Sequence, residues 1–219
     1  MVVEKNNNYS DIEKNKINKD ENIKLEIPYL KEEEINQDTS IEESINNCLN
    51  LEELKSFMLA FNGCDLKKTA TQLVFSDGNP KSNVMIIGEA PGAEEDRQGK
   101  PFCGASGQLL DKMLASINLD RNNVYITNVV NYRPPNDRKP EPSEINRYSE
   151  FLRQHISIID PKILILMGST AMESLFGSKI KISKERGTWK EIIINNKTYL
   201  TIITFHPAYL LRQACLLYT

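Results

Sequence analysis

The residues whose types and spacing point to chemistry begin with one long loop, residues 88–104, of sequence GEAPGAEEDRQGKPFCG. The loop holds four glycines, which allow a backbone to approach a ligand closely. The phosphate-binding patterns GxxxxGKS/T and GxGxxG are both missing, so the loop does not predict a phosphate cradle. Its length and its apolar tip, Pro101-Phe102, favour a binding role over an irregular surface loop, because long loops in compact domains are usually functional or disordered.

The elements that must position this loop follow an alternation of strands and helices from residue 83 onward. Apolar runs predict strands at 84–87, 124–130 and 163–167. Helical spacing predicts helices at 106–117, from a capping Ser143 to about 158, and at 169–176. Two more strands are expected at 188–194 and 198–205, around a tight turn at Asn195-Asn196. This order predicts an α/β fold in three α/β/α layers, with a mainly parallel central sheet.

Three unusual segments follow strands of this predicted sheet. They are residues 88–104, 128–140 and 205–212. Open parallel sheets bind ligands at the carboxyl ends of their strands. The three segments are therefore expected to meet in one site.

The N-terminal part differs from the rest in composition. Residues 1–40 are rich in Asn, Lys, Glu and Asp, which predicts a disordered acidic leader before a domain at 41–219. Residues 41–60 have helical spacing, with Thr39 or Ser40 as a cap. Residues 1–54 carry 6 Lys/Arg and 14 Asp/Glu, and the remainder carries 21 and 16. The mildly basic body is compatible with a polyanionic partner, although solvated surface charge gives the same count.

No apolar run reaches the length of a membrane span and no signal peptide is visible, so a cytoplasmic protein is expected. The four cysteines form no CxxC pair and no zinc spacing, and in a reducing compartment they are expected to be free thiols. His155 lies in a helical pattern, which favours packing or surface exposure over chemistry.

Three strings in the chain carry a resemblance to one family. The string GEAPGAEEDRQGKPFCGASGQLLD, from Gly88, resembles the first motif of the family-4 uracil-DNA glycosylases. Thr127-Asn128-Val129-Val130 with the following Arg133-Pro134-Pro135 resembles the second-strand segment of that family, and the string from His206 to Arg212 resembles its C-terminal motif. The match covers roughly residues 55–212, with all three strings in family order. It implies an enzyme that flips uridine out of DNA, hydrolyses the N-glycosidic bond and begins base excision repair.

The resemblance also implies roles for individual residues. Gly88, Phe102, Asn128 and His206 are expected to bind uracil. Phe102 would stack on the flipped base, although a loop-anchoring core Phe is the alternative. The amide of Asn128 suits uracil O4 and N3–H, which cytosine does not match, while a turn-forming Asn is the alternative. His206 would donate to uracil O2 as negative charge develops there, although a single His beside Pro is more often structural.

The water-orienting carboxylate is less defined by the sequence. Ala90 stands where the family-1 motif GQDPY carries its Asp. Glu89 and Glu95 are therefore the expected catalytic carboxylates, either to orient water or to stabilise an oxocarbenium ion. Glu94 and Asp96 are expected to be solvated or helix-capping.

Several residues near the strand ends are candidates for contact with DNA. Ser106, with Gly107, opens a helix whose N–H groups suit a phosphate. Leu210 or Leu211 suits a wedge into the gap that the flipped base leaves, and a buried leucine is the equal alternative. The basic candidates, each of which could equally be surface charge, are Arg133, Arg138, Lys139 and Arg212.

The chain departs from the family in two places. Most members hold a four-cysteine [4Fe–4S] cluster, but here Cys64 is a lone remnant. Tyr148 stands where the third cysteine is expected, and 162–168 holds no fourth. The expectation is therefore an enzyme without metal or cofactor. The apolar end at 214–219 resembles a truncation or a frame shift before a terminal helix, and a genuine alternative end stays open. If the missing helix covers the sheet, lower stability is expected.

The sequence thus predicts a monofunctional uracil-DNA glycosylase acting as a monomer on uracil-containing DNA. The acidic leader is a candidate for binding a repair or replication protein, and a solubilising tail is the simpler interpretation. Two alternatives stay open: a non-catalytic or degenerate DNA-binding relative, and a polymerase-associated accessory module.

Overall fold

The computed structural model describes residues 38–217, and the predicted disordered leader lies, up to residue 37, outside this range. The first helices are α1 (Asp38–Asn46), α2 (Leu51–Ala60) and α3 (Leu66–Thr69). One helical segment over 41–60 was the expectation, and the chain instead breaks between α1 and α2. The break follows from Asn50, whose side chain accepts from the Glu53 amide at 2.9 Å and so starts a new helix. Because α1 already begins at Asp38, Thr39 and Ser40 lie inside its first turn and not at its cap.

The predicted strands and long helices are all present in the part of the chain that the structure describes. The short elements at 66–69, 77–78, 93–98, 182–185 and 207–212 were not predicted, and neither were the two 3₁₀ turns. The elements after α3 are β1 (Asp77–Gly78), β2 (Val84–Gly88), α4 (Ala93–Gln98), α5 (Ala105–Ala115), β3 (Tyr125–Asn128), α6 (Pro142–Ile159), β4 (Ile163–Met167), α7 (Ser169–Phe176), α8 (Ile182–Glu185), β5 (Trp189–Ile194), β6 (Lys197–Thr204) and α9 (Pro207–Arg212), with 3₁₀ turns η1 (Pro135–Asp137) and η2 (Ala214–Leu217).

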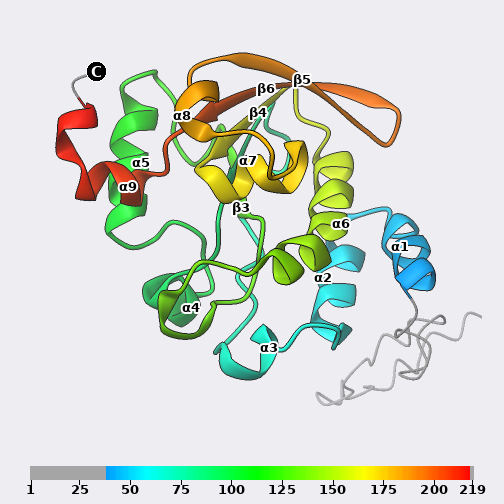
Figure 1. Ribbon diagram of the computed structural model, residues 1–219. Coiled ribbons are helices and arrows are strands. Elements are labelled where there is room, and N and C mark those ends of the chain that lie inside the picture. The colour runs from blue at the N-terminus through cyan, green and yellow to red at the C-terminus, as the bar shows by residue number, and fades with distance from the viewer. Residues whose placement is uncertain (1–37, 218–219) are drawn as a thin grey trace, which may run out of the picture. The chain divides into compact units, whose positions relative to one another are not determined.

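The strands form one sheet in the order β1-β3-β2-β4-β6-β5. Strands β3, β4, β5 and β6 of this sheet are labelled in Figure 1. The four inner strands pair in parallel, and β1 and β5 pair antiparallel at the two edges. The β5–β6 hairpin turns at Asn195-Asn196, both with positive φ, as a two-residue hairpin turn requires. The mainly parallel sheet is as predicted. Since β3 and β4 lie on opposite sides of β2, the chain reverses its winding there, and such a switch point opens a crevice at the strand ends.

Helices cover both faces of the sheet, which gives the predicted three layers. On one face, Leu110 and Leu114 of α5 pack with Ile86 and Ile126 in a buried cluster. On the other face lie α6 and α7, and His155 of α6 makes a 2.8 Å hydrogen bond with the buried hydroxyl of Tyr125. His155 is thus a packing residue, one of the two interpretations of its helical position.

Helix α6 begins two residues earlier than predicted. Pro142 occupies its first turn, and Glu141 is the capping residue, with its amide donating to Glu144 Oε2 at 2.7 Å. Ser143 is exposed inside the helix and does not cap it, which corrects the expectation. Among residues 38–217 no helix is long and apolar enough to cross a membrane.

Candidate active site

The carboxyl ends of the four parallel strands bring the three predicted segments together. Gly88 at the end of β2 is in register with Asn128 at the end of β3, and the Val129 amide donates to the Gly88 carbonyl at 3.0 Å. Gly168, directly after β4, donates to the Thr204 carbonyl of β6 at 2.9 Å. His206 follows two residues later, so residues distant in sequence share one edge of the sheet.

The close side-chain contacts at this edge of the sheet require a glycine at position 88. A Cβ there would lie 2.4 Å from Asn128 Oδ1 and 2.6 Å from the ring of Phe102. Contacts that short do not occur between real side chains, so any side chain at 88 must displace one of the two. The predicted uracil-binding residues Gly88, Phe102 and Asn128 therefore lie in direct contact.

Phe102 lies at the tip of its loop in a left-handed conformation, with φ of 53°. Its ring is 4% exposed and stacks on the His206 ring, with centroids 5.3 Å apart and planes inclined by 25°. Phe102 also belongs to the buried cluster beneath α5. The ring therefore anchors the loop and also forms a wall of the pocket. Anchoring the loop and stacking on a base are thus compatible roles for Phe102.

Asn128 is 3% exposed and lines the pocket. Its side-chain amide has no protein hydrogen-bond partner among residues 38–217. Asn131, three residues on, is equally buried but donates to the carbonyls of Val74 and Phe75 at 3.1 and 3.2 Å. The contrast separates an asparagine that holds the fold from one that lines the hollow with its donor and acceptor unpaired.

His206 caps the start of α9 and has a defined protonation. Its Nδ1 accepts from the Ala208 amide at 3.1 Å, so in the neutral ring the proton is on Nε2. Burial, and then the nearby charge of Arg212, lowers the pKa of His206 from 6.5 to about 4, against a smaller opposing effect of Glu95. At neutral pH the ring is an uncharged N–H donor.

These side chains surround a hollow of about 710 Å³, lined among others by Glu89, Ala90 and Ser106. The Glu89 carboxylate follows β2 directly and accepts a hydrogen bond from the buried hydroxyl of Thr170 on α7. Thr170 was not predicted as a site residue, although its place just after the strand β4 follows the same strand-end rule.

Glu95 lines the same hollow but is engaged by the backbone. Its Oε1 accepts from the amides of Cys103 and Gly104 at 3.0 and 2.8 Å, and its Oε2 accepts from Gly92 at 3.1 Å. Of the two predicted catalytic residues, Glu89 has the carboxylate that accepts fewer hydrogen bonds from the protein. Asp96, expected to be solvated or capping, is 4% exposed and accepts from the amide and hydroxyl of Thr71, which corrects that expectation.

The basic residues expected to contact DNA differ in how far they are already paired. Arg133 binds Asp137 at 2.7 Å, and Arg138 binds both oxygens of Glu144 at 2.6 and 2.8 Å. Lys139 lies 3.2 Å from Glu173. Arg212 is exposed at the pocket and has no ion-pair partner in the described residues. Of these four basic residues, Arg212 is therefore the one whose charge is not paired.

Leu210 does not have the exposure that a wedge needs. It is 7% exposed on α9, which packs on α5 (Figure 1). This corrects its assignment as a DNA-contacting residue. The neighbouring Tyr209 and Leu211 are 41% and 48% exposed and reach solvent instead.

The residues around Cys64 do not fit an iron–sulfur cluster that needs four thiolates. Cys64 lies beside the hydroxyl of Tyr148, which is 2% exposed. The rings of Tyr132 and Phe151 lie 6.5 and 6.0 Å from that of Tyr148, so aromatic side chains fill this region. Within 38–217 no group of three or more His, Cys, Asp or Glu side chains is placed to hold a metal.

Known proteins resemble the chain over most of this fold. Residues 75–216 match the family described as the uracil DNA glycosylase superfamily. A type-4 uracil-DNA glycosylase of Archaeoglobus fulgidus is 38% identical over 162 residues, 72% of this chain and 81% of that protein. The type-4 enzyme of Sulfurisphaera tokodaii is 41% identical over 167 residues, covering 72% and 74% of the two chains. That of Thermotoga maritima is 41% identical over 151 residues, covering 68% and 77%.

The matched range begins just before β1 and ends after α9, so it includes every strand and the whole pocket. The identities extend over two thirds or more of both partners in each of the three comparisons. The chain therefore belongs to the uracil-DNA glycosylase superfamily, and the three relatives compared above are type-4 enzymes of that superfamily.

Proposed function

We propose that this protein is a monofunctional uracil-DNA glycosylase, which hydrolyses the N-glycosidic bond of uracil in DNA and leaves an abasic site for base excision repair. One observation carries the proposal. One pocket at the switch point of the sheet is lined by the buried aromatic ring of Phe102, the unpartnered amide of Asn128 and the neutral imidazole of His206. The type-4 relatives, by name, act as uracil-DNA glycosylases.

Recognition of the base follows from the donors and acceptors of the pocket. The flipped uracil stacks on Phe102, and Asn128 meets its Watson–Crick edge. The amide carbonyl of Asn128 accepts from N3–H, and the amide N–H donates to O4. Cytosine presents an acceptor at N3 and a donor at N4, so each contact becomes a clash of like groups. An amide held by burial at 3% exposure therefore selects uracil.

Bond cleavage develops negative charge on the leaving uracil and positive charge on the sugar. The Nε2–H of His206 donates to O2 and stabilises the uracil anion without transferring a proton. The ring is already oriented by Ala208, so little reorganisation is needed. Glu89 faces the positive sugar and orients the attacking water, while Glu95 contributes mainly by holding the loop. A dissociative transition state needs little activation of that water.

The DNA backbone and the gap in the stack need contacts of their own. Arg212 and the first turn of α5 at Ser106 bind phosphate groups beside the pocket, since helix N-termini attract anions. Leu211, which is exposed at 48%, takes the wedge position that Leu210 does not occupy. Arg133 and Arg138 join this surface only if their carboxylate partners release them.

We further propose that the enzyme works without an iron–sulfur cluster, as a monomer in the cytoplasm. The proposal that the enzyme lacks a cluster is supported by the single Cys64 and by the aromatic packing around Tyr148. All four cysteines are free, as a reducing compartment favours. Any partner of the acidic leader would bind residues outside those that the structure describes.

The function is tested with purified protein and a uracil-containing oligonucleotide, followed by alkali to cut abasic sites. We expect strand scission at uracil and none in the matched cytosine oligonucleotide. His206→Ala and Asn128→Ala should each lower the rate by about 100-fold or more, since each leaves a charge or a buried group unmatched. Asn146→Ala, on the exposed face of α6, serves as the control. Absence of scission with stoichiometric enzyme rules the glycosylase function out.

A further inference from the structure

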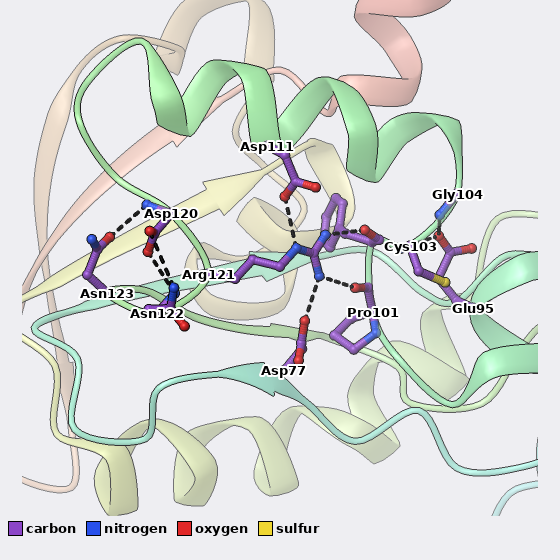
Figure 2. A network of polar contacts seen from close by, with 11 residues as sticks. Asp77, Glu95, Pro101, Cys103, Gly104, Asp111, Asp120, Arg121, Asn122 and Asn123 are labelled. Carbon is purple, nitrogen blue, oxygen red and sulfur yellow. Dashed lines mark hydrogen bonds and ion pairs between the residues drawn. The ribbon is translucent and has the colours of Figure 1, made fainter.

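Arg121 lies between α5 and β3, outside the three motif segments, yet its side chain reaches the loop that carries Phe102 (Figure 2). Its Nη1 donates to the Pro101 carbonyl at 3.2 Å, and its Nη2 donates to the carbonyl of Phe102. Two carboxylates bind the same guanidinium. Asp77 on β1 lies 2.6 Å from Nη1, and Asp111 on α5 lies 2.9 Å from Nε.

Glu95 holds the next two residues of the same loop with the opposite charge. Its Oε1 accepts from the amides of Cys103 and Gly104, as Figure 2 shows to the right of Arg121. The Arg121 cation thus binds the carbonyls of residues 101 and 102, and the Glu95 anion binds the amides of residues 103 and 104. Charged hydrogen bonds of this kind are stronger than neutral ones.

The loop needs such fixing because of the conformation at its tip. Phe102 has a φ of 53°, which is unfavourable for a bulky side chain. Its carbonyl also lies so close to α5 that a Cβ on Gly107 would be 1.6 Å from the oxygen. The backbone of Phe102 is therefore held between Gly107 and the guanidinium of Arg121, while its ring is stacked on His206.

We propose that Arg121 and Glu95 are positioning residues that clamp residues 101–104 and thereby hold the Phe102 ring ready to stack on uracil. The inference rests on the proposed stacking role of Phe102. Arg121 does not itself line the pocket and contacts only the backbone of the Phe102 loop, so it acts through the loop. Asp77 and Asp111 keep the guanidinium aimed at the two carbonyls.

A double-mutant cycle with Phe102 tests the clamp. Arg121→Gln should lower the single-turnover rate of uracil excision and weaken inhibition by free uracil, each by about 10- to 100-fold, because charged hydrogen bonds are lost. In a Phe102→Ala background the same substitution should cost less than about threefold. Equal losses in both backgrounds would show that Arg121 acts elsewhere and would overturn the proposal. Arg97→Gln, an exposed arginine paired with Glu94 on α4, is the matched control and should leave both quantities unchanged.

Hydrogen exchange separates the clamp from the stacking role. In Arg121→Gln, amides of residues 102–108 should exchange faster while those of β4 keep their protection. If Phe102→Ala alone leaves excision unchanged, the stacking role fails, and faster local exchange still supports the clamp. Unaltered exchange at 102–108 refutes the clamp itself.

A second variant covers the case in which Arg121→Gln unfolds. Asp111→Asn removes one half-exposed carboxylate from the guanidinium and should give a loss of about threefold that again depends on Phe102. If Asp111→Asn instead exposes the whole sheet to exchange, Arg121 supports the fold generally and the positioning role is wrong.

Discussion

The pH dependence of uracil release tests the protonation state of His206 directly. The Ala208 amide engages Nδ1, and the pKa of His206 is lowered to about 4, chiefly by burial. At pH 5 about nine-tenths of the rings are therefore neutral, and at pH 8 essentially all of them are. If the neutral Nε2–H is the working donor, this group should change the excision rate by less than about twofold between pH 8 and pH 5.

A requirement for the imidazolium would give a very different profile. With a pKa of about 4, only about one enzyme in a thousand would carry the charge at pH 7. The rate would then rise about tenfold for each unit of pH lowered towards 5. Single-turnover excision at pH 5, 6, 7 and 8, with enzyme in excess over labelled oligonucleotide, distinguishes the two. A tenfold rise per unit refutes the neutral-donor mechanism.

His206→Gln supplies the control, because the glutamine amide donates an N–H without titrating in this range. Any slope that persists in this variant belongs to other groups. Stability gives a second readout. The folded-state pKa lies below the unfolded value of 6.5, so the unfolded state binds the proton more readily. The contribution of His206 to the free energy of unfolding is thus complete above pH 6.5 and falls by about 3 kcal/mol as the pH drops to 4. His206→Gln should lose that part of the pH dependence, and an unchanged dependence would contradict the lowered pKa.

Four further predictions follow from the pocket and from the region of Cys64. Asn128→Asp should lower uracil excision by about 100-fold, because a carboxylate repels O4, and an unchanged rate in the oligonucleotide assay would contradict the recognition argument. Thr170→Val should lower excision by about threefold to tenfold through a misplaced Glu89, with Thr170→Ser restoring it, and equal rates in both variants would exclude that role. Gly88→Ala should lower the free energy of unfolding by about 1–3 kcal/mol and nearly abolish excision, since its Cβ has no room, and denaturant unfolding checks it. Iron analysis and the visible spectrum of freshly purified protein should show no cluster, and about four irons per chain would refute the proposal made from Cys64.

Much of the fold is predictable from the sequence, because it depends on local patterns. Apolar runs such as 84–87 and 163–167 can only be buried strands in an alternation of this kind, and the structure has them as β2 and β4. The strand-end rule then gathers the three motif segments, and Gly88, Phe102, Asn128 and His206 do meet. Helix starts were less predictable, since Asn50 and Glu141 compete with neighbouring residues of similar capping ability.

Partners that come from distant parts of the chain were decided only by the tertiary structure. The sequence leaves open whether Leu210 is buried, and it gives no sign that Arg138 is bound by Glu144 or that Asp96 receives the amide of Thr71. From the sequence, each of these residues could lie at the surface or contact DNA. Whether it is buried or paired depends on which element folds against it. The sequence by itself therefore determined which residue types surround the pocket. Their charge states, their free donors and the clamp on Phe102 arose from packing, because those properties depend on neighbours that no local pattern specifies.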